Sequence, residues 1–217
     1  MDIKTIKQLG ILFIFASLPV MAFATAKGFY VGLDGGLSNT HNESKTIQTG
    51  GVPGTIKVDP STTGFGGGFF LGYNISPFFA VEGGFTHYAN ATYTTNIPQK
   101  CNSPQIHENS VDFVGKAMLP FGDAFDVFAK GGVAAIRQSL AGSLLPTSTN
   151  LCGGTDSTTT ATRPTAAIGA SYYINQNWVA DISWSRVFEG SGIQNADLLA
   201  LGISYHFVDK YCGQFLC

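Results

Sequence analysis

Apolar side chains alternate with small or polar ones in eight segments of the chain, and this period of two is what most restricts the fold. Successive side chains of a β-strand point to opposite faces, so the alternation gives each segment one apolar and one small or polar face. A tilted strand of about ten residues is also long enough to cross a bilayer. The segments are Lys27–Leu37, Thr62–Tyr73, Phe78–Tyr88, Asn109–Leu119, Phe125–Ile136, Thr162–Tyr173, Trp178–Val187 and Leu199–Phe207.

The face opposite the apolar one decides between a soluble and a membrane barrel. In a soluble barrel such as a lipocalin this second face would meet water, whereas in a membrane barrel it would be enclosed. Gly, Ala, Ser and Thr fill most of its positions, and such a surface is too poor in charge to cover a soluble protein. The charged or titratable residues on this face include Asp34, Glu82, Asp112, Lys116, Lys130, Arg163, Asp181 and His206. We therefore expect lipid against the apolar face.

Aromatic residues mark the ends of the apolar face, as in the interfacial girdles of membrane barrels. They are Phe29, Tyr73, Phe79, Tyr172, Trp178, Tyr205 and Phe207.

The connections alternate between short and long. Short turns rich in Asn, Pro, Gly and Asp are expected at Asn74–Pro77, Pro120–Ala124 and Asn175–Asn177. Longer polar loops are expected at Ser38–Ser61, Asn90–Glu108, Gln138–Ala161 and Phe188–Asn195. Short turns on one rim and long loops on the other are typical of outer-membrane barrels. The sequence thus predicts an all-β, eight-stranded antiparallel up-and-down transmembrane β-barrel.

The first residues resemble an export signal. Lys4 and Lys7 precede an apolar run from Leu9 to Met21, and small-x-small cleavage patterns follow at Ala22–Ala24 and Ala24–Ala26. The alternative is an uncleaved anchor, but the run is shorter than the roughly 20 residues that span a bilayer. No later stretch reaches that length either.

The expected organisation is therefore a signal peptide at 1–24, a barrel at 25–207 and a periplasmic tail at 208–217.

Composition removes other classes of protein. Only 12% of the residues are charged and the formal net charge is -2, so a nucleic-acid-binding surface is not expected. With 44% hydrophobic residues, the chain is also too apolar for disorder.

The whole arrangement, with a last strand that ends Gly202-Ile203-Ser204-Tyr205-His206-Phe207, resembles the OmpA/OmpX-type outer-membrane barrel family. The resemblance implies a bacterial outer membrane, contact with its lipid and lipopolysaccharide, and Tyr205 and Phe207 as an insertion signal for the barrel-insertion machinery. In that family the aromatic residue usually ends the chain, whereas Val208–Cys217 follows here. We do not expect the peptidoglycan-binding domain that larger members of the family carry.

Four charged residues are expected at one level inside the barrel. Glu82, Lys116, Lys130 and Asp181 all lie a few residues from a short turn. Opposite charges with little water around them are costly unless they pair, so we predict an interior network among the four. Such a network would plug the narrow tube. In the alternative, each charge is hydrated separately in a wet lumen.

The four cysteines favour oxidation in an exported protein. Cys101 and Cys152 lie in the second and third long loops, which makes a loop-to-loop disulfide plausible, and Cys212 would then pair with Cys217. Four cysteines allow three connectivities, and a non-reduced digest analysed by mass spectrometry would distinguish them.

An enzyme active site is not expected, nor is a cofactor or a metal. A lipid-modifying barrel would need a nucleophile, a base and an orienting acid near the outer rim. His41 with Glu43 and Ser44, and His107 with Glu108 and Ser110, supply these residue types, but polar loops produce such clusters by chance. His206 is expected near the periplasmic end, away from the lipids of the cell surface, and His87 is expected at the membrane–water interface. The glycine-rich run Gly64–Gly68 does not match a phosphate-binding loop.

The preferred function is a structural and surface-interaction protein whose polar loops could meet a host or surface ligand. A small porin or narrow solute channel is the second hypothesis, and a lipid-modifying enzyme the third.

Overall fold

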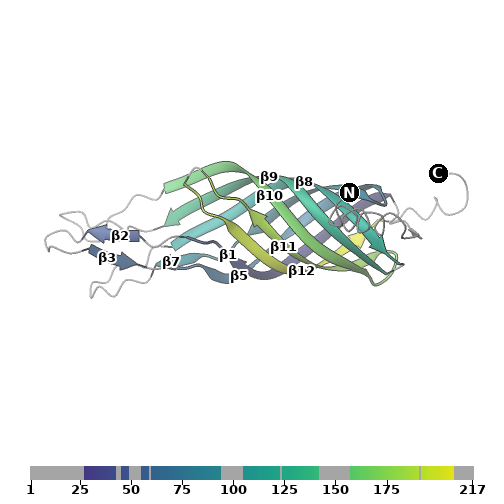
Figure 1. The fold of residues 1–217 in the computed structure, drawn as a ribbon, viewed down its shortest axis with the longest axis horizontal. Coiled ribbons are helices and arrows are strands. Elements are labelled where there is room, and N and C mark those ends of the chain that lie inside the picture. The colour runs from purple at the N-terminus through teal and green to yellow at the C-terminus, as the bar shows by residue number, and fades with distance from the viewer. Residues whose placement is uncertain are drawn as a thin grey trace, which may run out of the picture.

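Eight long strands form a closed antiparallel barrel (Figure 1). The computed structural model describes residues 27–42, 45–48, 55–58, 60–93, 105–122, 124–141, 157–190 and 192–207. The barrel strands are β1 (Gly28–Asn39), β5 (Thr63–Ser76), β6 (Phe79–His87), β8 (Gln105–Phe121), β9 (Phe125–Ala141), β10 (Ser157–Tyr173), β11 (Trp178–Val187) and β12 (Ala196–His206). Each pairs with the next along the chain, and β12 closes the ring on β1. The predicted fold class is confirmed.

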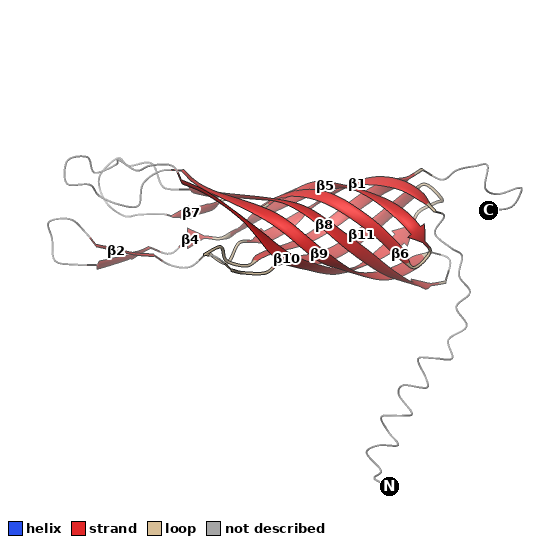
Figure 2. Cartoon of the chain, turned by 90° about the horizontal axis from the view of Figure 1, so that it is seen from above, coloured by secondary structure: helices blue, strands red, loops and turns tan. Residues whose placement is uncertain are grey.

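Four short strands lie outside this ring. A two-stranded hairpin joins β2 (Lys45–Gln48) to β3 (Thr55–Val58), and β4 (Pro60–Ser61) pairs with β7 (Ala91–Tyr93) beside the start of β8. Figure 2 shows β2, β4 and β7 beyond one end of the barrel. We call this the loop end, and the opposite one the short-turn end. None of the described residues forms a helix long and apolar enough to cross a bilayer.

The apolar face of every strand points outward, as the alternation predicts. Phe65 is 75% exposed and Leu201 is 68% exposed, which water would disfavour and acyl chains would not. Aromatic rings pair across strands near the short-turn end. The pairs are Phe29–Tyr73, Phe125–Tyr172 and Trp178–Tyr205, with ring centroids 4.8, 4.8 and 5.1 Å apart. The outer surface is thus an apolar belt with an aromatic rim.

The short turns close with side-chain hydrogen bonds, as their composition favours. Ser76 Oγ accepts from the backbone N–H groups of Phe78 and Phe79, and Asn175 Oδ1 accepts from those of Asn177 and Trp178. The predicted first turn began too early, because β5 stays paired with β6 as far as Ser76.

The predicted extents of the long loops are wrong in several places. β8, β9 and β10 have 17 residues each, so Gln105–Glu108, Gln138–Ala141 and Ser157–Ala161 belong to strands. Their side chains are largely polar, and the search for apolar alternation therefore missed them. What holds them is cross-strand pairing, such as Ser139 opposite Thr158, which depends on a partner strand and not on local pattern. The barrel wall consequently extends past the apolar belt.

Candidate functional site

The interior of the barrel is the candidate site, since the inward positions hold the buried charges. Glu82 of β6 is only 3% exposed. Its carboxylate lies 3.4 Å from Lys116 Nζ of β8 and 2.5 Å from Lys130 Nζ of β9, and it accepts a 2.6 Å hydrogen bond from Tyr30 Oη of β1. Two ammonium groups and one hydroxyl donor, from three different strands, thus contact one buried carboxylate.

The structure joins three of the four predicted network residues by ion pairs, and the fourth, Asp181, is in none of those pairs. Asp181 points inward from β11, but none of the ion pairs among the described residues includes it. Its carboxylate packs instead against Gly202 of the paired strand β12, where an added Cβ would lie 2.7 Å from either carboxylate oxygen.

Aromatic rings surround the two lysines and complete a lower layer near the short-turn end. Tyr30, Phe70 and Phe128 form this layer with Ala80 and Met118. Lys116 Nζ lies 4.4 Å from the centroid of the Phe128 ring and Lys130 Nζ lies 5.1 Å from that of Phe70, both within cation–π range.

Glycines on the neighbouring strands make room for these rings. A Cβ added at Gly72 would lie 2.3 Å from Cζ of Tyr30, and one added at Gly169 would lie 2.4 Å from Cζ of Phe128. The glycines on the inward face therefore leave the space that the large inward-pointing rings occupy. Sequence reasoning missed Phe70 and Phe128 because it treated the inward face as small. Phe70 lies two residues from Gly72, and Phe128 lies two residues from Lys130. This spacing puts each ring on the inward face of its strand and could have predicted both.

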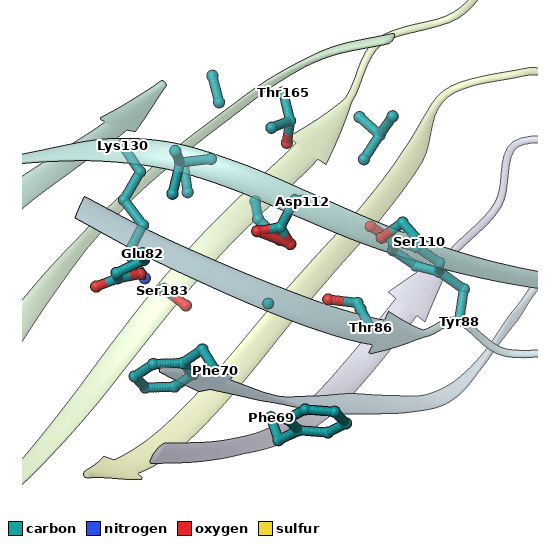
Figure 3. Close-up of a pocket in the computed structure, with 16 residues that line it drawn as sticks. Phe69, Phe70, Glu82, Thr86, Tyr88, Ser110, Asp112, Lys130, Thr165 and Ser183 are labelled. Carbon is teal, nitrogen blue, oxygen red and sulfur yellow. The ribbon is translucent and has the colours of Figure 1, made fainter. Parts of the chain in front are cut away.

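A cavity of about 60 Å³ lies above this layer (Figure 3). Glu82, Asp112 and Lys130 line it together with the hydroxyl groups of Thr86 and Ser183. This volume holds a few water molecules and its lining offers them partners, so it suits buried water.

An upper apolar layer covers the cavity toward the loop end. Tyr88, Ile136, Val187, Ile193 and Leu198 are its large members, and each is at most 3% exposed. Ile193 does not come from a strand, since it belongs to a turn closed by reciprocal backbone hydrogen bonds with Gly190. The predicted loop Phe188–Asn195 therefore contributes a plug residue, and the tube is filled at two levels.

Glu108 lies still nearer the loop end, beyond the apolar belt, where its outward neighbours His107 and Asn109 are polar. It is 1% exposed and accepts hydrogen bonds from Gln138 Nε2 at 2.7 Å and Asn42 Nδ2 at 3.1 Å. Burial raises the pKa of the Glu108 carboxyl, and the two amide donors act in the opposite direction. At the mouth of the barrel, this carboxyl of β8 thus links Asn42, in the segment that follows β1, to Gln138 of β9.

The residues weighed for catalysis do not form a triad. Glu108 and Ser110 are buried inside the wall, whereas His107 points outward and pairs with Asn90 through a 2.8 Å contact between Nδ1 and Oδ1. Alternation along one strand forces this separation.

The other histidines are equally scattered. His87 contacts Asn109 on the outer face, His206 stacks on Tyr30 inside the short-turn end, and His41 Nε2 lies 3.7 Å from Asp197. Glu43 and Ser44 lie outside the described residues. Within the described ranges, no three His, Cys, Asp or Glu side chains are grouped to hold a metal ion.

The remaining predicted site residues differ in what the structure says of them. Tyr205 and Phe207 lie together on the outer surface, with ring centroids 5.1 Å apart. Cys101, Cys152, Cys212 and Cys217 all lie outside the described residues.

Comparison with known proteins identifies the family. The model of the OmpA-like transmembrane domain matches residues 24–211. An uncharacterized protein of Coxiella burnetii is 32% identical over an alignment of 212 residues, and the match covers 83% of this chain and 85% of that protein.

Solved structures agree on the fold. Neisserial surface protein A matches with a TM-score of 0.56 at 18% identity, over 84% of this chain and 99% of its own. OprG from Pseudomonas aeruginosa matches with a TM-score of 0.57 at 12% identity, over 86% and 99%. At these identities the likeness concerns the fold alone. The chain belongs to the OmpA-like transmembrane domain family and is an eight-stranded barrel of the bacterial outer membrane.

Proposed function

We propose that this barrel is a closed structural anchor that displays polar β-hairpins outside the cell for surface interaction. The observation that carries the proposal is the filled interior. Glu82 with its two lysines and the surrounding rings occupies one level, and the layer around Tyr88 and Ile193 occupies another. A barrel of eight strands leaves little more than side-chain space inside.

The long strands support the display role. β8, β9 and β10 continue past the apolar belt as paired polar strands, and the mouth contact of Glu108 with Asn42 and Gln138 stiffens their base. A rigid stem of this kind would present the following loops to a host or surface ligand at a distance from the lipid.

Planar-bilayer recordings test the closed interior. The folded wild-type protein is expected to give no large, steady conductance, because both layers must open for ions to pass. Tyr88→Ala combined with Phe128→Ala removes one aromatic ring from each layer and should raise ion leakage through the barrel. A steady ohmic current from the wild type would contradict the proposal and favour the small porin.

The enzyme hypothesis has a separate readout. Expression of the protein should leave the mass spectrum of lipid A unchanged, and a new modified species would support a lipid-modifying activity.

We also propose that residues 1–24 are a cleaved export signal, that 208–217 form a periplasmic tail, and that Tyr205 and Phe207 guide insertion by the assembly machinery. The aromatic Phe207 is 54% exposed, as is Phe125 of the same rim. Phe207→Ala should therefore reduce the fraction of folded, heat-modifiable protein in cells several-fold, while Phe125→Ala should not. Equal losses would mean that both rings serve only the interface.

A further inference from the structure

A row of outward polar residues crosses four neighbouring strands where the apolar belt ends. His87 of β6, Asn109 of β8, Arg137 of β9 and Thr160 of β10 are consecutive partners in the strand register. We call them the Arg137 row. On the short-turn side of the row, the outward residues of β8 and β9 are apolar or glycine, with Val111 58%, Phe113 63% and Val133 52% exposed. The row therefore marks the boundary between hydrocarbon and headgroup on the loop side.

Among the described residues, Arg137 has no acidic partner at this boundary. Its side chain is exposed, and no ion pair or hydrogen bond between described residues includes its guanidinium. The outward positions of β6, β8, β9 and β10 hold no Asp or Glu.

Polar groups surround this free cation. His87 Nδ1 lies 2.6 Å from Asn109 Oδ1, and one rung farther out Ser139 Oγ lies 3.0 Å from Thr158 Oγ1. The patch combines an unneutralised guanidinium with amide, imidazole and hydroxyl groups.

Arg186 shows what a neutralised arginine looks like on the same surface. It also points outward near the loop end, from β11. Its Nε and Nη2 atoms each lie 2.6 Å from an oxygen of Asp197, and its guanidinium lies 5.1 Å from the centroid of the Trp184 ring. Of these two outward arginines, only Arg137 has guanidinium N–H groups that no described acidic residue occupies and that can therefore bind an anionic ligand.

We propose that the Arg137 row binds a phosphate group of lipid A, the phosphorylated glycolipid of the outer leaflet. A guanidinium matches phosphate in charge and in bidentate geometry. An outer-leaflet phosphate sits at the boundary where Arg137 lies, and the attached acyl chains would cover Val111, Phe113 and Val133 below it. The proposal rests on the outer-membrane location and does not depend on the closed interior.

Native mass spectrometry of the folded protein released from detergent micelles tests this site. With bisphosphorylated lipid A as the probe, Arg137→Gln should weaken binding about tenfold, the loss expected for one charge-assisted contact. Arg186→Gln is the matched control, because it removes the same charge from the same surface, and it should change binding by less than about twofold. Lipid A stripped of its phosphates should bind the wild type as weakly as intact lipid A binds the Arg137 variant.

Several outcomes would overturn the assignment. Unchanged binding by Arg137→Gln would do so, as would an equal loss in both variants or equal affinity for the dephosphorylated lipid. Arg137-dependent capture of a sulfated polysaccharide without any lipid A binding would assign the patch to a soluble partner instead. Heat-modifiability gels establish that each variant is folded before it is compared.

Discussion

Glu82→Gln is expected to lower the free energy of unfolding of the barrel by about 3–5 kcal/mol, the range for breaking a buried ion pair by removing one partner. The substitution keeps the shape of the side chain and removes the only anion within ion-pair distance of Lys116 and Lys130 among the described residues. Among the described residues, no carboxylate then remains at ion-pair distance from the two enclosed ammonium groups, and their cation–π contacts replace only part of the lost attraction.

Urea unfolding in lipid vesicles measures this loss. Trp178 and Trp184 are the only two tryptophans, and both lie on the outer face, so their fluorescence reports transfer from lipid to water. Asp181→Asn is the matched control. It also removes one inward negative charge, but from a residue outside the described ion pairs, and it should cost less than about 1 kcal/mol. Equal losses in the two variants would mean that total interior charge matters and that the Glu82 contacts do not.

The local pattern of the sequence predicts which strands form and which way they face. A shift by one residue would reverse every side chain of a strand, so the aromatic and aliphatic positions of Thr63–Ser76 or Trp178–Val187 specify their own orientation. The level of Glu82, Lys116 and Lys130 follows from their distance to the short turns for the same reason.

The features that sequence reasoning missed depend on partners far away in the chain. Phe70 and Phe128 point into the barrel because Gly32 and Gly169 on paired strands leave space for their rings. Ile193 enters the upper layer from a turn whose polar composition predicts only a loop. Asp181 was expected in the network because its distance from a short turn along the strand predicts its level in the barrel. That distance does not predict whether its side chain reaches the other three across the interior.

Two adjacent glycines of β9 offer the second large effect, because they differ in what an added methyl group would meet. A Cβ at Gly132 would lie 2.1 Å from the backbone oxygen of Phe113 and 2.7 Å from Cα of Val114, both on the paired strand β8. A Cβ at Gly131 would meet nothing within 4 Å. A backbone atom cannot rotate away as a side chain can, so relief at Gly132 requires the two strands to move apart.

Gly132→Ala should therefore destabilise the barrel by about 2–3 kcal/mol, near the upper end of the cost of overpacking. Gly131→Ala should leave stability within about 0.5 kcal/mol or raise it by up to about 1 kcal/mol, because alanine restricts the unfolded chain and its methyl group faces outward. The same urea titration in vesicles compares the two variants directly. Both substitutions add one methyl group to one strand, so a difference between them isolates the approach of the β8 and β9 backbones. If both variants unfolded at the same urea concentration, the narrow spacing of these strands would not be what requires glycine at position 132.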